Sequence, residues 1–152
     1  MENEIRNIHF SEYGVESELV LKVPCHFLLL NDYAKFFNHI TLSLPINSYV
    51  YISASRRTDG LCKFFYQTLK ERKKGAVITS RFRKEDKWSN NIKAVITGFC
   101  FNEMNFPGFD MTITSELVPA DGIGVDNALH IATALVLKKF FYPDISDDKL
   151  IE

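Results

Sequence analysis

The first half of the chain carries the hydrophobic pattern of β-strands. Residues 18–30 (ELVLKVPCHFLLL) are rich in strand-forming side chains, and Pro24 predicts their division into two short strands. Residues 40–55 alternate apolar and polar positions, which predicts one long strand interrupted at Pro45 and followed by a turn at RRTDG. Residues 61–70 fit either a strand or a short helix, because their periodicity does not decide between the two.

The second half changes to the helical period. The apolar residues that recur at this spacing are Trp88, Ile92, Val95, Ile96 and Phe99. They predict a core-facing helix over residues 88–100, with Ser89 or Asp86 as its N-cap. Residues 109–118 are typical of a strand. Residues 128–142 predict a last long helix that is apolar on nearly all sides and therefore central.

A loop with two glycines precedes this last helix. Gly122 and Gly124 allow a tight turn and leave bare backbone beside the helix N-terminus, a geometry suited to an anion such as phosphate. Asp126 stands in the same loop, and its carboxylate would repel a phosphate by about 1 kcal/mol or more unless a bound Mg²⁺ took it as a ligand. Asp126 and Asn127 also suit an N-cap and first helical turn that bind no ligand.

Composition limits the classes of function. A chain of 152 residues fits one domain with a sizeable core. Its 18 basic and 19 acidic residues nearly balance, so there is no electrostatic case for nucleic acid or an anionic membrane, and we expect the basic run at residues 70–87 to be a solvated connector. The three cysteines lack the spacing of a disulfide framework or a zinc site, and no metal site is predicted. No signal sequence or apolar run of roughly 20 residues is present, which predicts a cytoplasmic protein.

Three blocks of the sequence resemble galactokinases, which are members of the GHMP small-molecule kinase superfamily. Residues 108–135 (GFDMTITSELVPADGIGVDNALHIATAL) are similar to the family's strand, phosphate loop and helix. Residues 88–96 (WSNNIKAVI) resemble its W-x-N-Y-V-K-G-V-I helix, and residues 23–40 (VPCHFLLLNDYAKFFNHI) resemble its first motif, A-P-G-R-V-N-L-I-G-E-H-T-D-Y-N-G-G. The blocks stand in the family's order and cover most of residues 18–140.

The resemblance implies a fold and a set of site residues. The implied fold is an α+β domain over residues 1–152, with a mixed, mostly antiparallel sheet covered by helices. The implied cofactors are ATP and Mg²⁺, and the implied substrate is a sugar. By position in the motifs, the catalytic residue is His26, the sugar-binding residues are Asp32, Tyr33 and Lys35, and the nucleotide-binding loop consists of Gly122, Ile123, Gly124, Val125, Asp126 and Asn127.

Both motifs depart from the family's residues. The replacements are Asp32 for a glutamate, Tyr33 for a histidine, Lys35 for an acid, and Gly124, Val125 and Asp126 for a run of serines. The serine hydroxyls hold phosphate and magnesium in the family. Phosphoryl transfer depends on positive charge, metal and N–H donors around the γ-phosphate. The resemblance also implies a catalytic aspartate and a C-terminal domain beyond these motifs, so we expect that the 152 residues alone are not a competent kinase.

Two hypotheses about function follow. The first is a galactokinase-like, ATP-dependent sugar kinase with altered motifs; the second is a degenerate homologue that binds a ligand or another protein, and the residues themselves favour the second. Simpler roles also fit several candidates. His26 fits a buried, hydrogen-bonded histidine, His130 fits a surface or interhelical contact, and Asp32 could pair with Lys35 in solvent.

The last nine residues predict one more helix. Ser146 suits its N-cap, the first turn is acidic, and Leu150 is its first apolar residue. Because this helix stops before one turn is buried, we expect the chain to be part of a longer protein. By resemblance, the expected partner is a C-terminal domain that completes the nucleotide site.

Overall fold

The computed structural model describes residues 1–30, 40, 42–77, 82–117 and 124–151, except for the side chain of residue 151. Its elements, in chain order, are α1 (Glu2–Tyr13), β1 (Leu19–Leu30), β2 (Leu42–Arg56), β3 (Leu61–Tyr66), β4 (Glu71–Ala76), the 3-10 helix η1 (Lys84–Asp86), α3 (Ser89–Phe101), β5 (Phe109–Ser115), α4 (Val125–Phe141) and α5 (Asp147–Ile151). None of the described helices is long and apolar enough to cross a membrane.

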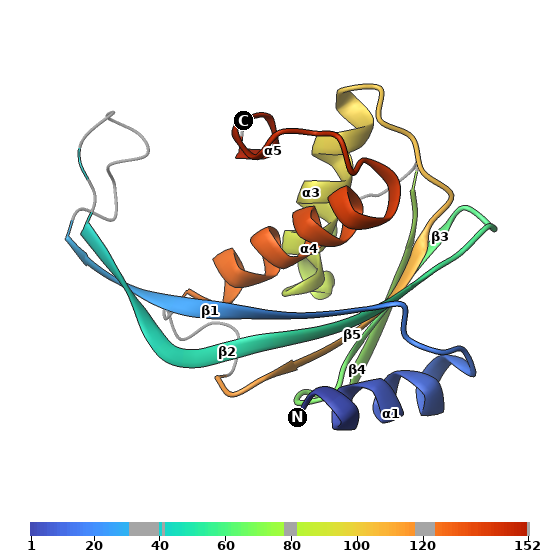
Figure 1. The fold of residues 1–152 in the computed structure, drawn as a ribbon, viewed down its shortest axis with the longest axis horizontal. Coiled ribbons are helices and arrows are strands. Elements are labelled where there is room, and N and C mark those ends of the chain that lie inside the picture. Colours follow the sequence, from blue (N-terminus) through green and yellow to red (C-terminus); the bar gives the residue numbers. More distant parts are fainter. Residues whose placement is uncertain (31–39, 41, 78–81, 118–123, 152) are drawn as a thin grey trace.

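Five strands form one sheet in the order β1-β2-β5-β3-β4. Neighbouring strands are antiparallel, except that β3 and β5 run parallel. Helices α3, α4 and α5 lie on one face of the sheet, and α1 lies on the other (Figure 1). This is the mixed, mostly antiparallel α+β fold that the sequence predicts. The predicted strand 109–118 is β5, and position 118 lies outside the described residues.

The strands β1 and β2 form a long curved ribbon that extends beyond the helices (Figure 1). The predicted division of β1 at Pro24 is wrong, and so is the interruption of β2 at Pro45, since both strands continue through their prolines. The register changes instead: Pro24 opposes Tyr49 and His26 opposes Pro45, so one residue of β1 stands against three of β2. A bulge at a sheet edge accommodates residues that lack an N–H donor.

Residues 61–76 form two strands, although the second of them is highly charged. Residues 61–70 form β3 and a turn, with Cys62, Phe64 and Tyr66 buried on one face. The expectation that residues 70–87 are only a connector is wrong, because residues 71–76 form the edge strand β4. An edge strand tolerates charged side chains because one of its sides faces water. Arg72 of β4 reaches Glu12 of α1, with 2.6 Å between Nε and Oε1.

Helix α3 confirms the predicted core-facing helix. Trp88, Ile92 and Ile96 are buried against the sheet. The predicted cap is wrong: no side chain caps the helix, and Ser89 Oγ instead donates to the carbonyl oxygen of Asp86 at 2.9 Å. The hydroxyl thus joins the helix to the preceding 3-10 turn.

Helix α4 is buried on one side only. It begins at Val125, three residues before the predicted start, because Gly124 adopts a left-handed conformation that turns the chain into the helix. Ile131 on its outer side is 49% exposed, so the predicted central position of this helix is wrong on that side, although its inner side is in the core. The short helix α5 is as predicted, and Lys149 N donates to Ser146 Oγ at 3.3 Å.

Candidate functional site

Two predicted site residues, 101 positions apart in the sequence, meet where β1 passes the start of α4. His26 lies on β1 at the register change, and Asn127 lies in the first turn of α4. Asn127 Nδ2 is 3.0 Å from His26 Nε2 and donates to it when that nitrogen is unprotonated. The fold therefore brings a residue of the first motif into contact with a residue of the predicted phosphate loop.

Gly124 makes this junction possible. Its backbone has φ 69° and ψ 11°, a left-handed conformation that glycine adopts without a steric penalty. A Cβ atom at this position would lie 2.8 Å from both the backbone N and the Nδ1 atom of His26. Real Cβ atoms do not approach other atoms so closely, so the loop can lie over His26 only because residue 124 has no side chain.

Asp126 is held in place by a residue of α3. It lies in the first turn of α4, and its Oδ1 atom accepts a hydrogen bond from Asn91 Nδ2 at 2.7 Å. The positive end of the helix dipole also favours a carboxylate here. These contacts agree with the alternative prediction that Asp126 belongs to a first helical turn that binds no ligand. The N-cap residue of α4 is Gly124. Asn91 was not among the predicted site residues, and its place in the WSNNIKAVI block is the signal in the sequence that points to it.

The start of α3 is anchored by a buried ion pair. Lys93 is 4% exposed, and its Nζ atom donates to Asp86 Oδ2 at 2.5 Å. Trp88 Nε1 donates to Glu71 Oε2 at 2.8 Å, and its ring packs edge-on against Tyr66. The ion pair ties α3 to η1, and the Trp88 contacts tie it to β3 and β4. Together they hold the start of α3, from which Asn91 reaches Asp126.

Several candidates cannot be placed. The sugar-binding candidates Asp32, Tyr33 and Lys35, together with Gly122 and Ile123 of the loop, lie outside the described residues. Val125 is buried at 3% exposure, so its side chain packs in the core and does not face a ligand. Within the described part of the chain, no group of three His, Cys, Asp or Glu side chains could hold a metal ion.

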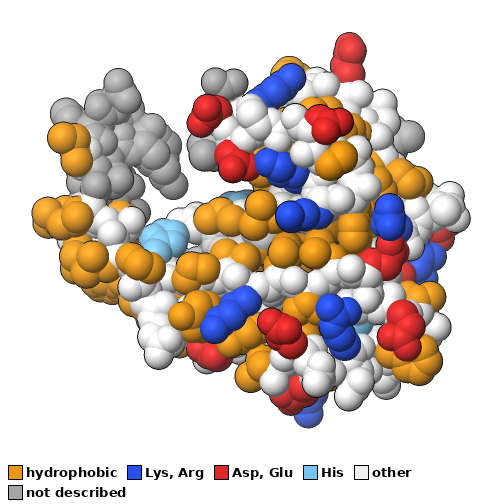
Figure 2. Space-filling view, in the orientation of Figure 1, with side chains coloured by type: hydrophobic (Ala, Val, Ile, Leu, Met, Phe, Trp, Pro, Cys, Tyr) orange, Lys and Arg blue, Asp and Glu red, His pale blue; other side chains and the backbone are white. Residues whose placement is uncertain are grey.

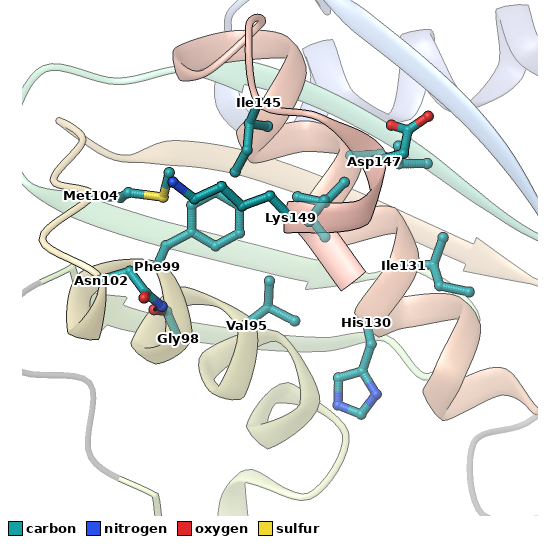
Figure 3. Close-up of a pocket in the computed structure, with 13 residues that line it drawn as sticks. Val95, Gly98, Phe99, Asn102, Met104, His130, Ile131, Ile145, Asp147 and Lys149 are labelled. Carbon is teal, nitrogen blue, oxygen red and sulfur yellow. Dashed lines mark hydrogen bonds between the residues drawn. The ribbon is translucent and has the colours of Figure 1, made fainter. Parts of the chain in front are cut away.

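His130 lies on α4 one turn after Asp126. It lines a pocket between α3, α4 and α5 (Figure 3). Burial lowers the pKa of His130 below its ordinary value. Most other side chains around this pocket are apolar and include Val95, Phe99 and Ile131. This half-buried position on the pocket wall is compatible with the surface or interhelical role expected for His130.

In sequence, the chain is similar to one part of proteins named as galactokinases. No protein-family model matches it. A protein of Treponema pallidum with a provisional galactokinase name is 37% identical over 147 residues, which cover 97% of this chain and 37% of the relative. The galactokinase of Bacillus subtilis is 22% identical over 156 residues and is covered to 40% of its length. The chain thus spans about two fifths of the curated relatives that it matches.

Solved structures share the fold. The galactokinase of Lactococcus lactis complexed with galactose superposes with a TM-score of 0.79 over 99% of this chain and 40% of that protein, at 17% identity. The mevalonate kinase of Methanococcus jannaschii superposes with a TM-score of 0.61 over 88% of this chain, at 15% identity. The predicted resemblance to an N-terminal galactokinase region and the predicted fold class are both confirmed.

Proposed function

We propose that this chain, which corresponds to the N-terminal region of galactokinase-like GHMP kinases, keeps the backbone of a phosphate loop but does not itself transfer phosphate. In this proposal the 152 residues serve as a ligand-binding or protein-interaction module of a galactokinase-like protein. A cytoplasmic location, which the sequence predicts, is part of the same proposal.

One observation carries the proposal: the carboxylate of Asp126 stands at the start of α4, where Asn91 holds it. The first N–H groups of a helix lack intrahelical partners and would otherwise suit a phosphate. ATP with Mg²⁺ would supply a transferable phosphoryl group. The described part of the loop, residues 124–127, offers one carboxylate and no hydroxyl, so these residues do not fit that cofactor.

A second candidate function is sugar phosphorylation by a longer protein that contains this region. It is favoured by the 37% identity that extends over 97% of the chain. The shared fold with a galactokinase that was solved with galactose makes D-galactose the first sugar to test. Mg²⁺ could then make Asp126 a ligand and remove its repulsion.

Replacement of Asp126 by serine tests the role of the carboxylate. In titration calorimetry with Mg-ATP, we expect Asp126→Ser to bind at least about 5-fold more tightly than the wild-type chain, since removing one close like-charge contact is worth about 1 kcal/mol or more. Asp148→Ser is the matched control, because Asp148 is also an exposed acid in the first turn of a helix, α5. We expect no change in that variant.

Phosphorylated galactose in a coupled assay of the wild-type chain with Mg-ATP would disprove the non-catalytic proposal. Equal affinities of Asp126→Ser and wild type would show that this carboxylate is not what excludes the nucleotide.

A further inference from the structure

The strand β4 forms one edge of the sheet and is strongly basic. Among the strands that the structure describes, it pairs with β3 on one side and with none on the other. Three of its six residues are Arg72, Lys73 and Lys74, and Lys70 precedes it in the turn. The backbone N–H and C=O groups on the open side of such a strand can pair with another extended chain.

Two lysines oppose each other on the face of the sheet that carries α1. Residues 62, 64 and 66 of β3 are buried in the core beneath α3 and α4, so the alternate residues Lys63 and Phe65 point to the other face. Lys63 lies opposite Lys74 of β4, and Phe65 lies opposite Arg72. Side chains directly opposite each other in antiparallel strands are about 5 Å apart at Cβ, and like charges in such a pair destabilise the sheet.

The acids near these two lysines are bound to other groups. Lys63 also lies opposite Asp110 of β5, but both oxygens of that carboxylate accept from Arg57 Nη1, at 3.0 and 2.8 Å. Two further acids of this region are taken in the same way, Glu12 by Arg72 and Glu71 by the indole of Trp88. Within the part of the chain that the structure describes, neither Lys63 nor Lys74 forms a salt bridge. The fold thus places two ammonium groups together without a counter-ion.

The charge of this edge indicates an acidic partner. The β4 strand of a second copy would set basic side chains beside basic side chains, which opposes the pairing. An extended segment with a carboxylate at every second position would instead place these groups beside Lys74 and Arg72, while its backbone pairs with the open side of β4. Nucleic acid would satisfy the charge but leave the backbone groups of the edge unpaired. A polypeptide therefore fits both features of the surface.

We propose that the open edge of β4 is an interaction surface for an extended, acidic segment of a partner protein. The segment adds to the sheet as a further strand beside β4 and supplies carboxylates to Lys63 and Lys74. This inference rests on the proposed interaction role of the chain and names the chemistry of the partner. Because the recognition depends on exposed charges, the association weakens as the salt concentration rises.

Fluorescence anisotropy at low salt tests the surface with a labelled heptapeptide of alternating glutamate and threonine. The same peptide with N-methylated backbone amides keeps the charge but loses the N–H donors, and we expect it to bind at least about 5-fold more weakly. Lys74→Glu should weaken binding of the first peptide at least about 5-fold. This variant removes the like-charge pair with Lys63, so it should fold as stably as the wild type. Lys139→Glu is the matched control, because Lys139 is an exposed lysine of α4 on the other face of the sheet, and we expect no change.

Three results would overturn the proposal: no saturable binding of the first peptide to the wild-type chain, equal affinities of the two peptides, or unchanged binding by Lys74→Glu. A single-stranded oligonucleotide that binds more tightly than the peptide and loses affinity in Lys74→Glu would also overturn it, by assigning the edge to nucleic acid. Sugar phosphorylation by the wild-type chain would disprove the proposed non-catalytic function but not the binding of an acidic segment to β4.

Discussion

At Gly124, a single missing side chain determines how α4 meets β1. Gly124 and Gly14 have nearly the same backbone conformation, with φ 69° and 70° and ψ 11° and 14°. They differ in surroundings, since a Cβ at Gly14 would meet no atom within 4 Å, whereas a Cβ at Gly124 would collide with His26. A side chain at Gly14 would therefore cost stability through its backbone conformation alone, whereas one at Gly124 would also clash with His26.

Alanine substitution at the two positions makes this difference measurable. Gly14→Ala should lower the free energy of unfolding by about 1 kcal/mol, which is the usual cost of a left-handed alanine. Gly124→Ala should cost at least about 2 kcal/mol, because the loop must also move off His26. Urea unfolding followed by circular dichroism gives both values. Equal losses would mean that the loop relaxes around the methyl group without strain.

At the scale of elements, α1 is the part that the hydrophobic pattern did not predict. It packs on the face of the sheet opposite to α3 and α4, and its central contact is polar. His9 is completely buried, with Nδ1 3.0 Å from Thr112 Oγ1 and Nε2 2.9 Å from Ser55 Oγ. A histidine on the inner side of a short amphipathic helix does not count as hydrophobic in a periodicity analysis, so the helix escaped detection.

Burial lowers the pKa of His9 to about 4, from an ordinary value near 6.5. Between these two values the unfolded chain binds more protons than the folded chain, so stability falls as the pH falls. We expect the free energy of unfolding to be fully retained above pH 6.5 and to drop by roughly 3 kcal/mol toward pH 4.

His9→Gln removes the titrating group and should flatten this dependence, apart from the slope contributed by the other titrating groups, His130 among them. Urea unfolding at several pH values between 4 and 7 measures both proteins. An unchanged slope in His9→Gln would assign the acid sensitivity to other groups.

At the scale of the molecule, the strands in the centre of the sheet are buried, whereas one end of the β1–β2 ribbon exposes hydrophobic side chains. The central strands β2 and β5 contribute Val50, Ile52, Met111 and Ile113 to the core. Phe27, Leu30, Leu42 and Leu44 are exposed at the far end of the β1–β2 ribbon, where hydrophobic side chains also gather in Figure 2. The stability of the chain is therefore expected to be uneven.

Hydrogen exchange should reveal this gradient. Amides in β5 and in the adjoining half of β2 should exchange only through global unfolding, because the strands on both sides cover them. Amides of α5 should exchange by local opening and be at least about 100-fold less protected. Mass spectrometry of fragments labelled in the native state measures both regions. Equal protection in α5 and β5 would show that α5 unfolds only with the core.

Sequence patterns predicted the core helices and strands, because α3 and the long strands each present a regular apolar face. The hydrophobic pattern led to wrong predictions for β4 and for Pro24. Strand β4 was interpreted as a connector because its residues are mostly charged. An edge strand can carry such side chains, since it pairs with a neighbour on one side and faces water on the other. Pro24 was interpreted as a strand break, although a bulge at the sheet edge lets the strand continue through it. For the site, the motifs identified His26 and Asn127, but their contact depends on pairing across 101 residues.

The sequence by itself determined the fold class and the family resemblance, since these depend on local periodicity and on motifs that the residues carry along the chain. By resemblance, it also predicted that Gly124, Val125 and Asp126 stand where the family has a run of serines. Only the tertiary structure decided that Gly124 lies over His26, that Asn91 fixes Asp126, and that α3, α4 and α5 leave a mostly apolar pocket. The reason is physical: each of these features is a contact between elements distant in sequence, and such contacts exist only once the sheet has brought the elements together.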